Sequence, residues 1–253
     1  FMNKKRTIVT IIGITLSTAL MVGIGLLVST FLRAMIDDVV ENSGSYHAYF
    51  DGVTQNEVEQ IKRHIDVSDS YSYGVVGFAN ISSTNTYKPY VYIVSADDEY
   101  FAHEVLLEGR YPTNDHEIVI PNHLLTNGEV EFSVGDEITL EVGPRVSDGE
   151  EIYSNDISLI EVYDENDEET VDETLLPRFT KTYQIVGIID RSHAENYSAP
   201  GYMVFTSKSK DIQMYRTFVE YKNIKNTYKI TKNICESLED TVSCNVHDNL
   251  LYY

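Results

Sequence analysis

The sequence predicts an α+β protein with one N-terminal transmembrane helix, followed by two β-α-β halves that flank a β-rich insert. Three observations carry this prediction. Residues 7–32 contain no ionisable side chain. Short runs rich in Val, Ile and Tyr, divided by turn residues, recur from residue 46 to residue 247. Two segments with helical apolar spacing, residues 57–65 and 224–238, lie near the two ends of this β-rich region.

The apolar run is long enough to span a membrane. A helix over residues 7–32 would reach roughly 39 Å, and a hydrocarbon core is about 30 Å thick. A helix also satisfies its own backbone hydrogen-bonding groups, as lipid requires. The flanking basic residues are Lys4, Lys5 and Arg6 before the run and Arg33 after it. This asymmetry predicts a cytoplasmic N-terminus and an extracytoplasmic main domain.

The identity of this apolar run and the role of its small residues each have an alternative interpretation. A cleaved secretory signal also begins with basic and then apolar residues, but its apolar core has roughly 7–15 residues and a small-x-small cleavage site follows it. The run is longer and lacks that site, so we favour a span. Small residues within it would let a second helix approach closely, although glycine is common in membrane helices in any case. These residues are Gly13, Ser17, Ala19, Gly23, Gly25 and Ser29.

Charge excludes some partners of the remaining chain. No acidic residue precedes Asp37, so the part outside the span and its flanks has 15 basic and 40 acidic residues, a net charge of −25. Nucleic acid and anionic lipid headgroups are poor partners for such a surface. Cationic peptides or metal ions are electrostatically allowed, but a solvated acidic exterior is the favoured explanation of the charge.

The two cysteines are Cys235 and Cys244. In an extracytoplasmic domain they could form a disulfide, closing a short loop worth roughly 2–3 kcal/mol. Two reduced, partly buried thiols are an equal alternative, because the sequence gives no distance between them.

The first half begins after a stalk. Helical character continues from residue 31 to residue 42, which predicts a stalk continuous with the span, and Ser43-Gly44-Ser45 is expected to end it. Thr54 and Glu57 have the spacing of a capping box. The expected elements are a strand at residues 46–50, a helix with Val58, Ile61 and Ile65 on one face, and strands at residues 70–81 and 87–95.

The insert and the second half follow. Gly109 stands at a strand entry where a positive φ would favour glycine, and Gly187 lies inside an apolar strand, which indicates a bulge or a close backbone approach. Strands are expected at residues 117–121, 129–133, 137–142, 157–162 and 182–189, then at 202–206, 215–221 and 241–247. A helix is expected at residues 224–238 with Tyr228, Ile230, Ile234 and Leu238 on its apolar face.

The acidic segment at residues 164–169 raises the question of calcium. Between Arg145 and Arg178 there are twelve acidic residues and no basic one. The segment lacks the glycine and the ligand order of an EF-hand, so a solvated hairpin tip is favoured over a calcium loop.

Catalytic motifs are missing or incomplete. His116-Glu117 begins like a zinc-protease motif, but residue 120 is Ile, so the second histidine is absent. Ser207 and Lys210 match S-x-x-K without the K-T-G that should follow. The seven histidines are scattered, and structural or solvated roles are expected for them. We therefore predict no catalytic, cofactor-binding or metal-binding residue and no cofactor.

Four stretches together resemble the FtsX-like or MacB-type permease family of bacterial ABC transporters. Residues 3–14 (NKKRTIVTIIGI) are similar to the family's first span, and residues 107–120 (LEGRYPTNDHEIVI) to its segment of the form GR-x-P followed by NEIVI. Residues 134–140 (VGDEITL) and 183–189 (YQIVGII) are similar to two later family strands. Each motif is weak alone, but four in this order are fairly specific.

The resemblance implies a fold, partners and a location. Residues 1–45 would be the basic lead, span and stalk; residues 46–98 and 201–253 would form a porter-like subdomain, and residues 99–200 a sabre-like insert. The chain would lie in a bacterial cell membrane and act as a dimer with a second permease copy or homologue. A cytoplasmic ABC ATPase would drive movement of the outer domain, on a cationic peptide, lipid or lipoprotein substrate.

An alternative function is a single-span membrane-anchored receptor or ligand-binding domain. The sequence stops at Tyr253 without the further spans and cytoplasmic loop of a permease, and Phe1 precedes Met2, so we expect an excerpt of a longer polypeptide. Further hydrophobic segments beyond Tyr253 would support a permease, and a stop codon would support the receptor.

Overall fold

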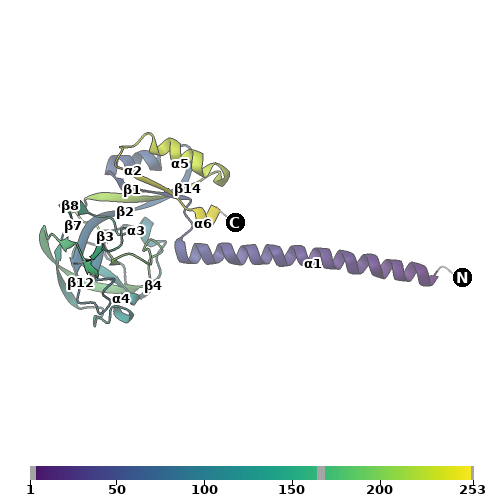
Figure 1. Cartoon of the computed structure of the whole chain (residues 1–253), viewed down its shortest axis with the longest axis horizontal. Coiled ribbons are helices and arrows are strands. Elements are labelled where there is room, and N and C mark those ends of the chain that lie inside the picture. The colour runs from purple at the N-terminus through teal and green to yellow at the C-terminus, as the bar shows by residue number, and fades with distance from the viewer. Residues whose placement is uncertain (1–3, 164–168, 252–253) are drawn as a thin grey trace. The chain divides into compact units, whose positions relative to one another are not determined.

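The computed structural model describes residues 4–163 and 169–251 (Figure 1). The chain divides into two compact units. One contains the residues up to Ser45 and those from Asp248 onward, and the other runs from Tyr46 to His247. Each unit is described by itself.

The first unit is dominated by one helix. Helix α1 (Lys4–Ser43) has 40 residues, none of them buried, and is long and apolar enough to cross a membrane. It runs without interruption through the predicted stalk. Gly44 follows with a φ of 87°, and its N–H donates to the carbonyl of Val40, so a left-handed glycine ends the helix as expected. The short helix α6 (Asp248–Leu251) belongs to the same unit.

The second unit contains a mixed ten-stranded sheet. Its order is β15 (Ser243–Val246), β1 (Ala48–Val53), β14 (Met214–Tyr221), β2 (Val67–Asn80), β3 (Tyr90–Ser95), β13 (Gly201–Thr206), β5 (Glu117–Pro121), β12 (Phe179–Ile189) and β4 (Leu106–Gly109), with β6 (Glu137–Val142) also paired to β12. The pairs β3–β13 and β5–β12 are parallel and the others antiparallel. Strands of the expected insert therefore continue the sheet of the expected porter-like halves, and the division into subdomains remains a prediction within one compact unit.

Smaller elements complete this unit. Strands β9 (Glu161–Tyr163) and β10 (Glu169–Val171) pair with each other, and β11 (Thr174–Leu175), β7 (Arg145–Ser147) and β8 (Glu150–Ile152) form a three-stranded sheet. The acidic segment considered for calcium falls mostly outside the described residues, between β9 and β10. The short helices are α3 (Asp98–Phe101) and α4 (Asn122–Thr126).

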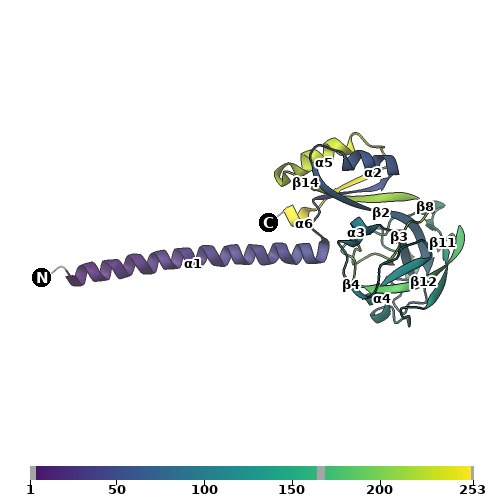
Figure 2. The same cartoon turned by 180° about the vertical axis from the view of Figure 1, so that it is seen from behind.

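Two helices cover one face of strands β1 and β14 (Figures 1 and 2). They are α2 (Gln55–Lys62) and α5 (Thr227–Cys235), the latter preceded by the 3₁₀ turn Ile224–Asn226. The predicted capping box of Thr54 and Glu57 is present. We call the core beneath these helices the aliphatic cluster; its buried members are Ala48, Phe50, Val53, Val58, Ile61, Val67, Val219, Tyr221, Ile230, Ile234 and Val242.

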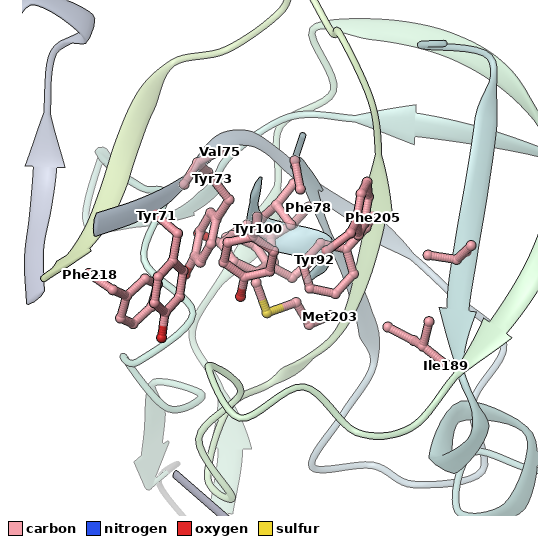
Figure 3. Packing of buried hydrophobic residues seen from close by; sticks show 14 of the residues in the cluster. Tyr71, Tyr73, Val75, Phe78, Tyr92, Tyr100, Ile189, Met203, Phe205 and Phe218 are labelled. Atoms are coloured by element: carbon pink, nitrogen blue, oxygen red, sulfur yellow. The ribbon is translucent and has the colours of Figure 1, made fainter. Parts of the chain in front are cut away.

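A second core is rich in aromatic rings. Figure 3 shows Tyr71, Tyr73, Tyr100, Phe205 and Phe218 packed together. Tyr71 and Phe218 are direct partners on β2 and β14, and their rings stack with centroids 5.0 Å apart. We call this core the aromatic cluster. It accounts for much of the tyrosine content, because cross-strand aromatic pairs stabilise sheets.

Some predicted positions are wrong. Ile65 is 78% exposed because α2 ends at Lys62, one turn earlier than the apolar spacing suggests. Tyr228 is 61% exposed although its neighbours Ile230 and Ile234 are buried. Residues 129–133 form no strand. Local periodicity marks apolar residues but cannot say where the chain turns away from the core.

The backbone geometry predicted for the two glycines is confirmed, although Gly109 ends strand β4 and does not stand at the entry of a strand. Gly109 has a φ of 75°, and a side chain there would meet the carbonyl of Val186. Gly187 is its register partner on β12, next to a bulge, and a Cβ there would lie 2.6 Å from the carbonyl oxygen of Arg110. Strands β4 and β12 can therefore approach closely only because both positions lack a side chain.

Candidate functional site

The first and last residues of the second unit are fastened to each other. His247 donates its backbone N–H to the carbonyl of His47 at 2.9 Å, and its Nδ1 lies 3.0 Å from the carbonyl oxygen of Tyr46. The rings of Tyr46 and His247 stack with centroids 4.6 Å apart. We call Tyr46, His47 and His247 the terminal joint. Every covalent link between this unit and the rest of the chain passes through it.

The terminal joint is anchored to strand β14 by His47. Its backbone N–H donates to the carbonyl of Val219 at 2.8 Å, and its Nδ1 accepts a hydrogen bond from the N–H of Tyr221 at 2.8 Å. Accepting at Nδ1 requires an unprotonated nitrogen there. Burial lowers the pKa of His47, which agrees with this neutral form.

A buried histidine cluster adjoins the joint. Tyr46 packs on Phe218 and lies 6.4 Å from His193, ring to ring. The Nε2 of His193 is 3.3 Å from the hydroxyl of Tyr71, and its Nδ1 is 3.7 Å from a carboxylate oxygen of Glu104. The members of the histidine cluster are Tyr71, His103, Glu104, Ser192 and His193.

Three histidines that are scattered in the sequence lie close together in the fold. His103 stacks on Tyr71 with centroids 3.8 Å apart, and His193 and His247 lie against the rings of Tyr71 and Tyr46. These histidines are far apart in sequence. Only the pairing of distant strands brings them together, so no local motif could have identified the cluster.

Burial controls the charge state of the cluster. Glu104 accepts a hydrogen bond from the hydroxyl of Ser192 at 2.6 Å, but burial raises its pKa to about 7. Burial, with the nearby His103 and His247, lowers the pKa of His193 to about 4. An ion pair would shift both values in the opposite directions. At mildly acidic pH Glu104 and His193 are thus a neutral acid beside a neutral imidazole.

Strand β1 is also held by a buried ionic cluster. The guanidinium of Arg216 on β14 lies 2.6 Å from Asp51 on β1 and 2.8 Å from Asp156 in the segment before β9. It also lies over the ring of Tyr49, 4.9 Å from the centroid. Burial alone would lower the pKa of Arg216, but Tyr73, Asp51 and Asp156 raise it further, so the guanidinium stays charged. One cation therefore ties β1 to a segment more than 100 residues away.

A second buried ion pair fixes the small three-stranded sheet. Arg145 on β7 and Glu173 have fully buried side chains with nitrogen and oxygen 3.0 Å apart. Arg145 also donates to the carbonyls of Ser154 and Ile157 and lies over the ring of Phe78. These two residues are 28 positions apart, and the composition of the chain between them gave no sign that they would pair in the core.

The residues singled out in the sequence lie in both units. Lys4, Lys5, Arg6 and Arg33 are exposed on α1, on either side of the apolar run. Cys235, at the end of α5, and Cys244, on β15, are joined as a disulfide with Cα atoms 6.2 Å apart. Within residues 4–163 and 169–251, no group of three or more His, Cys, Asp or Glu side chains is placed to hold a metal ion.

Comparison with known proteins gives a family match. The family model described as MacB-like periplasmic core domain matches residues 7–232. A search of curated proteins finds no match. The chain is similar to the solved structure of the extracellular domain of noncanonic ABC-type transporter YknZ from Gram-positive bacteria, with 7% identity and a TM-score of 0.43 over 79% of this chain and 99% of that chain. It is also similar to the periplasmic region of MacB from Actinobacillus actinomycetemcomitans, with 7% identity and a TM-score of 0.45 over 85% of this chain and 95% of that chain. It is also similar to a domain of a putative permease protein from Porphyromonas gingivalis (9% identity, TM-score 0.35, 79% and 86%).

Proposed function

Because the chain belongs to the family of MacB-like periplasmic core domains, we propose that it couples cytoplasmic ATP hydrolysis to movement outside the membrane, as the first span and extracytoplasmic domain of an ABC transporter permease. A permease component is not itself an enzyme. ATP would be hydrolysed by a separate cytoplasmic ABC ATPase subunit, and the sequence given has no P-loop of its own.

The observation that carries the proposal is the uninterrupted helix. Helix α1 extends from Lys4 to Ser43, well beyond the apolar run, and only Gly44 and Ser45 separate it from the terminal joint. A continuous helix transmits displacement along its axis, because its backbone hydrogen bonds resist compression and bending. The terminal joint would receive this displacement at the first residue of the β-rich unit.

Orientation and partners follow from charge and family. Lys4, Lys5 and Arg6 favour a cytoplasmic N-terminus, which puts the β-rich unit outside a bacterial cell membrane. The permease would work as a dimer with a second copy or a homologue. Among cationic peptides, lipids and lipoproteins as substrates, the charge of −25 outside the span and its flanks favours cationic peptides.

The test is an insertion of Gly-Gly after Met35, in the stalk. Two added residues lengthen a helix by about 3 Å and rotate its continuation by about 200°, and each glycine weakens the helix by about 1 kcal/mol. In the complete transporter, reconstituted with its ATPase, we expect ATP hydrolysis to continue while transport is lost. Transport at the unaltered rate would contradict the proposal.

A matched insertion controls for general damage. Gly-Gly placed after Gly149 lengthens the turn between β7 and β8, where Asp148 and Gly149 already have positive φ. This variant should keep both ATP hydrolysis and transport. Circular dichroism of both variants should match the parent protein, which separates loss of coupling from loss of folding.

A further inference from the structure

A pocket of about 360 Å³ opens on the second unit where three loops meet. The loops join β2 to β3, β8 to β9, and β12 to β13. This volume is within the range of small-molecule sites, about 300–1,000 Å³. Six of the lining residues matter here: Asn85, Tyr87, Lys88, Ser158, Leu159 and Tyr197.

The loops around the pocket are held in place by buried polar contacts. Lys88 donates to a carboxylate oxygen of Glu195 at 2.9 Å and to the carbonyl of Ala199 at 2.7 Å. The side-chain amide of Asn155 bonds both the N–H and the carbonyl of Gly201, at 3.0 Å each. Since each loop is fixed to a strand end or to its neighbour, the pocket is formed before any ligand arrives.

Two of the residues that line this pocket are solvent-exposed tyrosines. Tyr87 is 71% exposed and Tyr197 is 77% exposed. The guanidinium of Arg191 lies 3.7 Å from the centroid of the Tyr197 ring, which orients that ring. Leu159 adds an aliphatic surface. Exposed rings beside a concave surface offer flat faces on which a ligand can stack.

The charges near the pocket select against ions. Lys88 and Arg191 share the carboxylate of Glu195, so a cationic ligand would meet two positive groups with one negative group between them. Anions are disfavoured by the acidic chain as a whole. The hydroxyls of Ser158, Tyr87 and Tyr197 make no hydrogen bond to other residues that the structure describes. Neutral hydrogen-bonding groups and flat rings are therefore what the pocket presents.

We propose that this pocket binds a neutral saccharide of one or two rings. The apolar C–H face of a pyranose ring stacks on tyrosine, and its hydroxyl edge bonds neutral donors and acceptors, which are the two kinds of group found here. The inference does not rest on the proposed coupling function, and either can fail alone.

Saturation-transfer NMR on the full chain in lipid nanodiscs tests the proposal, because glycosidic detergents would compete for the site. The probes are N,N′-diacetylchitobiose, cellobiose and mannobiose. At least one should receive saturation on its ring C–H protons. Tyr87→Ala and Tyr197→Ala should each weaken that affinity roughly fivefold, the size of a lost aromatic contact. The matched control is Tyr228→Ala, an exposed tyrosine on α5 outside the pocket, which should leave the affinity unchanged.

Three results would overturn the proposal. One is no transfer to any of the three saccharides. Another is transfer that persists at full strength in both pocket variants. The third is an uncharged peptide such as acetyl-Gly-Leu-Gly-amide binding in a Tyr87-dependent way while the saccharides do not, which would assign the pocket to a peptide partner. Unchanged circular dichroism of the variants shows that they are folded.

Discussion

The aliphatic cluster and the region around the aromatic cluster are stabilised in different ways. The aliphatic cluster lies under two amphipathic helices and contains almost only hydrocarbon, with a capping box and a disulfide at its edges. The region around the aromatic cluster includes buried charges and histidines such as Arg145, Arg216, Glu104 and His193. Hydrocarbon packing depends weakly on pH, whereas buried titratable groups respond to it. The first region is therefore a scaffold, and the second can respond to its surroundings.

The largest expected change in stability is at a buried ion pair in the region around the aromatic cluster. Arg145→Met leaves Glu173 buried without its partner, and breaking such a pair costs about 3–5 kcal/mol. The double variant Arg145→Met with Glu173→Leu removes both charges and should recover most of that loss. Urea unfolding of the protein in nanodiscs, followed by circular dichroism, measures both. Equal destabilisation by the single and double variants would mean that side-chain packing, and not the unpaired charge, determines the loss of stability at this site.

The scaffold can be probed with two isoleucines four residues apart. Ile61 is fully buried in the aliphatic cluster, and Ile65 is 78% exposed just beyond the same helix. Ile61→Ala should lower the free energy of unfolding by about 2–4 kcal/mol, and Ile65→Ala should change it by less than about 0.5 kcal/mol. Similar effects of the two substitutions in the same urea assay would show that α2 extends past Lys62.

Reducing the Cys235–Cys244 disulfide should have a somewhat smaller effect on the scaffold. The bridge closes a loop with a sequence separation of 9 residues, and a loop this short is worth roughly 2–3 kcal/mol in the chain-entropy model. Thiol labelling before and after reduction counts the cysteines that are paired. Adding reductant should lower the urea midpoint of the parent protein. It should not change the midpoint of the double variant Cys235→Ser with Cys244→Ser, which has no disulfide to reduce. Two thiols reactive before reduction would refute the pairing.

The sequence could predict the elements that depend on contacts between neighbouring residues. The capping box at Thr54 and the strands Glu117–Pro121 and Glu137–Val142 depend on neighbouring residues, and these elements have the predicted bounds. The stalk continues the span because nothing in residues 31–42 interrupts a helix. Local rules were sufficient wherever the determining contacts lie within a few residues.

The buried titratable groups could not be predicted in this way. Arg145 meets Glu173 because β7 and β11 pair, and Glu104 meets His193 although 88 residues separate it from the neighbouring Ser192. The sheet order places β13 between β3 and β5, which no spacing in the sequence indicates. The pocket is missed for the same reason, because its three loops come from distant parts of the chain.

The smallest expected effect concerns pH. Burial raises the pKa of Glu104 to about 7 in the folded protein, above the ordinary value of 4.5. The folded state then binds the proton more tightly than the unfolded state, so this contribution to stability is complete below pH 4.5 and is lost as pH rises through 7. His193, whose pKa falls to about 4, contributes stability above pH 6.5 that is lost as pH falls through 4. Together they predict a broad stability maximum between about pH 4.5 and pH 6.5, where the two contributions change in opposite directions and largely cancel.

Glu104→Gln separates the two contributions. The amide cannot ionise, so only the contribution of His193 remains. In the parent protein the loss due to Glu104 and the gain due to His193 largely cancel between pH 5 and pH 8, so its free energy of unfolding should fall by less than about 1 kcal/mol. That of Glu104→Gln should instead rise over the same range by on the order of 2 kcal/mol. Glu108→Gln, at an exposed carboxyl on β4, is the matched control and should keep the parent profile. Urea unfolding at pH 5, 6.5 and 8 gives the three free energies needed. If the free energy of unfolding of Glu104→Gln changes with pH in the same way as that of the parent protein, Glu104 is not the titrating group, and burial of its carboxyl contributes nothing to the pH dependence of stability.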